Sequence, residues 1–132
     1  MTPLRRVLPW GVAAVLALDT VGSVAARTFG FDYNRLTVVS FGLYATVGFV
    51  AGRLGGLASA VLASILTGLV DATLGWAISW LIGPGRPPAA AQTPSMLLLG
   101  MLIAIGSAAA LGLTGGVLAQ LIGGSKRAAA RN

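Results

Sequence analysis

Residues 95–122 read SMLLLGMLIAIGSAAALGLTGGVLAQLI, a stretch that contains no charged side chain. As an α-helix it would be about 40 Å long, because each residue adds about 1.5 Å. The hydrocarbon core of a bilayer is about 30 Å thick, and an unbroken apolar run of this length is typical of a helix that crosses it. The stretch therefore predicts an all-α integral membrane protein.

Three more apolar runs precede this one, and together the four predict a compact bundle of transmembrane helices. Basic residues close two of them, Arg27 and Arg53, as expected where a helix leaves the bilayer. The last two runs are joined by a segment rich in Pro and Gly, which does not favour a helix. We predict one transmembrane domain over residues 1–132, with helices over about 7–27, 36–53, 55–82 and 95–122 and a loop over 83–94.

The composition agrees with a membrane location and excludes several classes of function. Charged residues make up 9% of the chain, against about a quarter in a soluble domain. The absence of Cys and His removes disulfides, thiol chemistry, zinc fingers and the usual haem ligand. The net charge of +6 comes from basic residues at the ends of apolar runs, which favours topology signals over nucleic-acid binding. We expect no cofactor, no metal and no nucleic-acid partner; the expected partner is the lipid bilayer.

The distribution of basic residues predicts that both termini lie in the cytoplasm. This orientation puts six basic residues on the cytoplasmic side and three on the other, and Lys and Arg are enriched on cytoplasmic loops. We therefore predict a multi-pass protein of a bacterial-type inner (plasma) membrane. The cytoplasmic set is Arg5, Arg6, Arg53, Lys126, Arg127 and Arg131, and the outer set is Arg27, Arg35 and Arg86.

The first apolar run also has an alternative interpretation as a signal peptide. Arg5 and Arg6 precede the apolar stretch 7–18, and Ser23, Val24 and Ala25 provide a small-residue cleavage site. Asp19 and the length of the run favour a retained helix instead. Cleavage would leave three helices, and an intact mass would distinguish the two.

Small residues recur every fourth position in two of the predicted helices. Positions i and i+4 share one helix face, so each set forms a groove in which another helix can pack closely. The grooves could pack within one bundle, or one could form the seam of a homo-oligomer or a contact in a larger membrane complex. The residues are Gly56, Ala60, Ser64, Gly68 and Ala72 in one helix, and Gly100, Ala104, Ala108, Gly112 and Gly116 in the other.

Two aspartates within apolar runs, Asp19 and Asp71, are the candidate functional residues. An aspartate at the middle of a membrane helix costs about 2.5–3.5 kcal/mol, and such residues face the bundle interior or a wet cavity. Counted along their helices, both would lie at a similar depth. They could bind a proton or a cation in a cavity lined by Ser23, Thr67 and Tyr44, or they could lock the packing through hydrogen bonds.

The sequence gives no sign of catalysis. Two membrane aspartates are also found in intramembrane aspartyl proteases, but the glycine-x-glycine-aspartate motif of that family is missing here. No histidine is present to activate a serine, and no Gly-rich phosphate loop occurs. We therefore expect no catalytic residue and no enzyme activity.

A group of residues near the start of the chain resembles the opening of the small multidrug resistance transporters. These are dimers of four-helix proteins, with an acidic residue in the first helix and a tyrosine near it in the second. The resemblance implies a coupling role for Asp19 and a pocket role for Tyr44, although the family uses glutamate and has no counterpart of Asp71. The residues that carry it are Leu18, Asp19, Thr20, Val21, Gly22, Ser23, Arg27, Gly30, Phe31 and Tyr44.

The sequence alone thus favours a small multi-pass protein of unassigned activity, with a structural, accessory or oligomer-forming role. The alternative is a small proton- or cation-linked transporter or channel that uses Asp19 and Asp71. The two differ in whether the acids face a wet cavity or a closed, hydrogen-bonded core.

Overall fold

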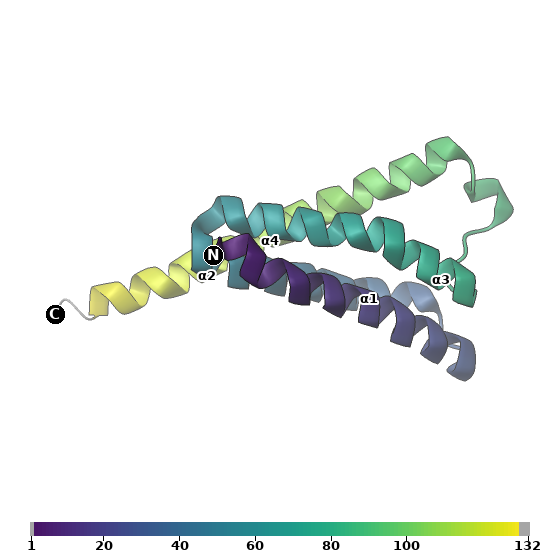
Figure 1. Cartoon of the computed structure of the whole chain (residues 1–132), viewed down its shortest axis with the longest axis horizontal. Helices are drawn as coiled ribbons and strands as arrows, with labels where there is room; N and C mark the ends of the chain where they lie inside the picture. Colours follow the sequence, from purple (N-terminus) through teal and green to yellow (C-terminus); the bar gives the residue numbers. More distant parts are fainter. Residues whose placement is uncertain (1, 130–132) are drawn as a thin grey trace.

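The computed structural model describes the backbone of residues 2–129 and the side chains of residues 2–123. This part of the chain is entirely helical apart from its connections (Figure 1). Three of its helices are long and apolar enough to cross a membrane: Pro3–Phe29, Tyr33–Ile82 and Pro94–Gly123. The expected all-α, membrane-type fold is confirmed at this level. The elements are α1 (Pro3–Phe29), η1 (Tyr33–Leu36), α2 (Thr37–Val70), η2 (Asp71–Gly75), α3 (Trp76–Ile82), η3 (Ala89–Ala91) and α4 (Pro94–Ala129).

Helix α2 folds back on itself at Gly56. The backbone of Gly56 has φ 78° and ψ −175°, a conformation that essentially only glycine adopts. In a straight helix, Tyr44 and Asp71 would lie about 40 Å apart, yet their side chains are hydrogen-bonded. Ser64 Oγ also donates to the backbone oxygen of Tyr44, at 3.0 Å. Residues 37–55 and 57–70 therefore lie side by side, as Figure 1 shows.

The helix boundaries differ from those expected. The chain reverses at Gly56 rather than between the predicted helices 36–53 and 55–82, and no loop separates its two arms. The first helix begins at Pro3 instead of residue 7, since proline suits the first turn, and the last extends to Ala129 instead of 122. The Pro/Gly connection 83–94 contains a 3₁₀ turn at Ala89–Ala91, and Pro94 already belongs to α4.

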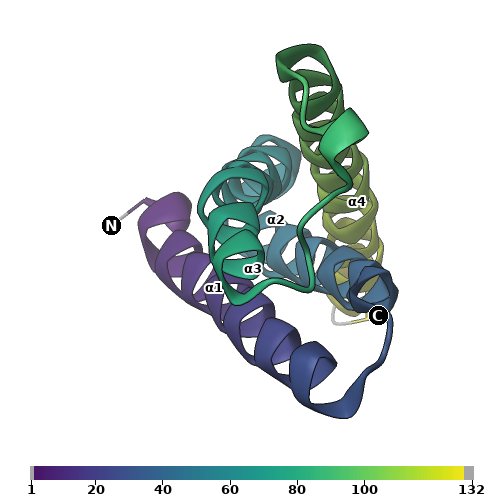
Figure 2. The ribbon, with the colours of Figure 1, turned by 90° about the vertical axis from the view of Figure 1, so that its right-hand side faces the viewer.

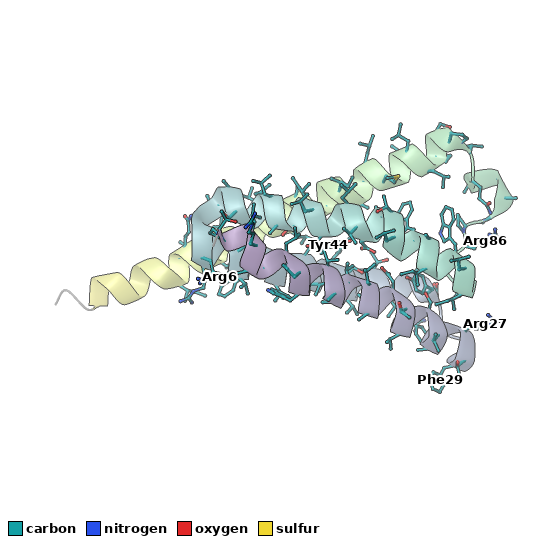
Figure 3. The ribbon with its side chains drawn as sticks, viewed as in Figure 1. Arg6, Arg27, Phe29, Tyr44 and Arg86 are labelled. Carbon is teal, nitrogen blue, oxygen red and sulfur yellow. The ribbon has the colours of Figure 1, made fainter. Side chains whose placement is uncertain are left out.

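The bundle has two ends that differ in their connections. At one end, here called the Gly56 end, the N-terminus lies beside the turn of α2, because a Cβ on Gly55 would be 2.6 Å from Pro3 Cγ. At the other, the Arg86 end, α1 stops at Gly30 and α3 leads into residues 83–93. Figure 3 shows Arg6 near the first end and Arg27 and Arg86 at the second.

The two sets of small residues pack mainly against each other within one chain. A Cβ on Gly112 would be 2.5 Å from Ser64 Cβ, and a Cβ on Gly48 would be 2.6 Å from Gly112 Cα. Helix α4 therefore approaches both arms of α2 more closely than larger residues allow. The same contact includes Gly116 with Ala60, and Gly68 with Ala108 and Ala104, whereas Gly100 meets the ring of Trp76. Ala72 of η2 is buried as well.

Gly56 differs from the other predicted packing glycines. A Cβ on it would meet nothing within 4 Å, because it forms the turn at the end of the bundle. Gly56 has the fourfold spacing of the other small residues, but its backbone is not helical. Its role in the fold is conformational, and the groove begins at Ala60.

Candidate functional site

The two carboxylates within apolar helices, Asp19 and Asp71, meet inside the bundle. Asp19 lies on α1 and Asp71 opens η2, and both are buried, with 5% and 7% of their surface exposed. Gly75 separates them: a Cβ there would be 2.8 Å from Asp71 Oδ1 and 2.9 Å from Asp19 Cγ. Only a residue without a side chain leaves room for both groups, because atoms of both carboxyl groups lie within 3 Å of this one position.

A wide turn of helix creates this arrangement. Residues Asp71–Gly75 form a π-helical turn between α2 and α3, which fits one extra residue into the turn and rotates the helix beyond it. Asp71, Ala72 and Gly75 are all buried as a result. Turns of this kind occur frequently at functional sites, and this one places Asp71 and Gly75 against α1.

Each acid accepts a hydrogen bond from one tyrosine. Tyr33, in η1, donates its hydroxyl to Asp19 Oδ1 at 2.9 Å. Tyr44, on the first arm of α2 and 2% exposed, donates to Asp71 Oδ2. Asp19 Oδ2 is buried and has no partner among the described residues. The hydrogen-bonding capacity of Asp71 is therefore better satisfied than that of Asp19.

No basic side chain among residues 2–123 takes part in these contacts. Arg27 instead donates to the backbone oxygen of Ile82 at 2.9 Å, which ties α1 to the end of α3. Arg53 lies 5.9 Å from the ring of Phe49 near the Gly56 end. Two carboxylates packed around one glycine repel each other when both are charged. A shared proton or a bound cation would balance the charge.

A cavity of about 240 Å³ opens beside the two acids. Its polar wall contains both aspartates and both tyrosines, together with Thr37, Ser40 and Ser107, and its apolar wall includes Phe41, Trp76 and Ile103. Figure 3 shows Tyr44 near the middle of the bundle, well away from both ends. The acids therefore combine a buried position with open space on one side.

The structure brings together three of the five residues expected at the site. Asp19, Asp71 and Tyr44 line the cavity, whereas Ser23 and Thr67 do not. Thr67 Oγ1 is buried and donates to the backbone oxygen of Ala63 at 2.9 Å. Ser23 is fully buried one turn beyond Asp19, and its Oγ has no hydrogen-bond partner among the described residues.

Sequence reasoning missed Tyr33 and Gly75 as parts of the site. Tyr33 lies in the connection between the first two predicted helices, where an aromatic residue suggests only the membrane interface. Its contact with Asp19 depends on how the connection that contains Tyr33 folds back over α1. Gly75 lies four residues beyond Asp71, and that spacing on a helix was the one available sign that it shares a face with the acid.

The donor set limits what the site could hold. The described residues contain no group of three or more His, Cys, Asp or Glu side chains that could bind a metal ion. Two carboxylates and two hydroxyls are hard oxygen ligands, which suit a proton or a hard cation rather than a soft metal ion.

No protein-family model, curated protein or solved structure matches this chain. The resemblance to the small multidrug resistance transporters therefore rests on the residues named for it. In the structure, Tyr44 donates a hydrogen bond to Asp71 rather than to Asp19. The hydroxyl that donates to Asp19 belongs to Tyr33.

Proposed function

We propose that this protein crosses a cell membrane four times, with both termini in the cytoplasm, and carries a proton or a small monovalent cation at Asp19 and Asp71. The fold-back of α2 at Gly56 supports the four crossings, since it divides the span Tyr33–Ile82 into two arms. The excess of basic residues on one side supports the orientation in an inner (plasma) membrane. The meeting of the two acids beside a cavity is the observation that supports the function.

The energy of the acid pair argues for a bound positive charge. Each aspartate costs about 2.5–3.5 kcal/mol at the middle of a membrane helix, and bringing the two together adds their repulsion. A structural lock would require only one acid and one donor. Here both acids pack against Gly75, and Asp19 Oδ2 has no hydrogen-bond partner in the described chain. A proton or cation between them offsets both costs.

The second candidate is a structural, accessory or oligomer-forming role. The tyrosine hydroxyls that cap both acids favour it, because such bonds could also fix the packing of α1 and α2. Exposed apolar side chains along α4 favour an oligomer or a larger complex, since Leu98, Leu102 and Leu118 are about half exposed. Lipid could cover the same side chains. Neither candidate function assigns catalysis to the chain.

Ion and proton flux in proteoliposomes tests the proposal. The wild type is compared with Asp19→Asn and Asp71→Asn under gradients of H⁺, Na⁺ and K⁺. Asp32→Asn is the matched control, because Asp32 is the third acid of the chain and its carboxylate accepts from Asn34 N in an exposed connection.

The expected result is flux in the wild type and in Asp32→Asn, with a loss of at least tenfold in the other two variants. Folding is checked by far-UV circular dichroism and by elution from a sizing column. Flux that survives both membrane substitutions would exclude the acid pair as the coupling site. No flux of any of the three cations would favour the structural role.

A further inference from the structure

We infer that the acid pair is reached only from the Arg86 end, through a vestibule between α3 and α4, while apolar packing closes the Gly56 end. This inference rests on the proposed cation site and adds the route by which a cation enters it. It depends on three features: a second cavity, the divergence of α4, and the packed core below the acids.

The vestibule is a second cavity of about 470 Å³. Tyr33, Thr37, Trp76, Gly100 and Ile103 line both it and the smaller cavity at the acids, so the two adjoin. A volume of this size exceeds the needs of a few ordered water molecules and falls in the range of small-ligand pockets. The two cavities together lead away from Asp19 and Asp71 in one direction.

That direction is toward the Arg86 end. Gly85, Pro87 and Ala91, from the connection between α3 and α4, line the vestibule at its far side. Figures 1 and 2 show why space remains there: the first part of α4 diverges from α3 toward this connection. Close packing of α4 begins nearer the Gly56 end, where Ala108 and Gly112 contact the second arm of α2.

The opposite side of the acid pair is packed and apolar. Val7, Val47, Ala51 and Ala63 form a buried cluster between the acids and the Gly56 end, each with at most 1% of its surface exposed. A Cβ on Gly11 would lie 3.0 Å from Thr67 Oγ1 and 3.1 Å from Val47 Cγ2, so α1 approaches both arms of α2 closely here. A cation crossing this cluster would lose its hydration among apolar side chains. The Thr67 hydroxyl beside Gly11 already donates to the backbone oxygen of Ala63.

The charge of the lining selects for cations. Asp19 and Asp71 are the charged residues that line the two cavities, and no Lys or Arg of the described chain lines either. Negative charge at the end of a narrow, low-dielectric passage raises the local concentration of cations. Trp76 and Trp80 line the vestibule with rings stacked 6.3 Å apart, and aromatic faces also attract cations.

Single cysteines can test the route, because the natural chain has none. Ser107→Cys and Ser40→Cys place a thiol on the wall of the cavity at the acids, and Val47→Cys places one in the apolar cluster. Arg86→Cys and Arg53→Cys mark the two ends. Each variant is reconstituted in vesicles and treated from one side with a membrane-impermeant trimethylammonium thiosulfonate, and modification is followed by intact mass.

We expect Ser107→Cys to react at least tenfold faster from the side on which Arg86→Cys reacts than from the side of Arg53→Cys. Val47→Cys should react from neither side. A neutral reagent of similar size should react more slowly at Ser107→Cys than the cationic one. This difference should disappear when Asp19→Asn and Asp71→Asn are added, because the attracting charge is then removed.

Three outcomes would overturn the inference. Reaction of Ser107→Cys from the Arg53 side, or reaction of Val47→Cys, would show that the Gly56 end is open. Failure of both cavity cysteines to react from either side, in variants that elute and fold like the wild type, would show that water does not reach the vestibule. None of these results bears on flux, whereas an absence of flux with the expected labelling would refute the proposed transport and leave the route intact.

Discussion

Removal of the Tyr44 hydroxyl is expected to destabilise the protein by about 1–2 kcal/mol. Tyr44→Phe keeps the ring and deletes the donor to Asp71 Oδ2. Hydrogen bonds to charged groups contribute about 1.5–3 kcal/mol in soluble proteins, but interhelical bonds in a membrane protein average about 0.6 and reach about 1.7 kcal/mol. The upper part of the membrane range applies here, because donor and acceptor are 2% and 7% exposed.

The backbone around Tyr44 should remain in place in this variant. Ser64 Oγ donates to the Tyr44 backbone oxygen, a contact that does not involve the deleted hydroxyl. Reversible unfolding by SDS in mixed micelles, followed by far-UV circular dichroism, measures the change in free energy. A loss of 1–2 kcal/mol corresponds to about a 5- to 30-fold change in the folded-to-unfolded ratio.

Thr46→Val is the matched control for this measurement. Thr46 lies half a turn further along the same arm, and its hydroxyl donates to Gly42 O at an exposed position within the helix. We expect its loss to change the free energy of unfolding by less than about 0.5 kcal/mol. If Tyr44→Phe were no less stable than Thr46→Val, the buried bond to Asp71 would be absent and the reasoning would be wrong.

Three glycine substitutions give further predictions, two in the same unfolding assay and one in the flux assay. Gly56→Ala should cost about 1–3 kcal/mol, because its backbone conformation strains any residue with a Cβ. Gly42→Ala, with nothing within 4 Å, should be neutral or slightly stabilising, because alanine is the better helix former. Gly112→Ala should also cost about 1–3 kcal/mol by overpacking against α2, while Gly106→Ala on the same helix meets nothing and should not destabilise. Gly75→Ala should reduce cation flux at least tenfold, since its Cβ would occupy the space between the two acids.

Each of these predictions has an outcome that contradicts the structure. Equal stability of Gly56→Ala and Gly42→Ala would mean that α2 does not reverse at Gly56. Equal stability of Gly112→Ala and Gly106→Ala would mean that the small-residue faces do not pack within the chain. Wild-type flux in Gly75→Ala would show that the transported cation does not occupy the space between Asp19 and Asp71.

The sequence by itself determined the class of the protein and the pair of acids worth testing. Apolar runs such as 95–122 must be helical in a bilayer, because every backbone polar group there needs a partner within its own segment. The same cost of burying polar groups singles out Asp19 and Asp71. Small residues at fourfold spacing likewise predict close helix contacts, because the spacing fixes which side chains share a face.

Only the tertiary structure decided which residues meet. Tyr33 reaches Asp19 across a connection, and Tyr44 reaches Asp71 across the reversal at Gly56, and neither contact has a local signal in the chain. The helical periodicity suggested Gly56 as a packing residue, although it makes the turn, because a stripe of glycines does not record the backbone dihedral of any one of them. The cavity also depends on the angle at which α4 diverges, and that angle is set by contacts between distant segments. Local sequence fixes what each helix can bury, whereas the contacts between helices decide where two buried acids share one space.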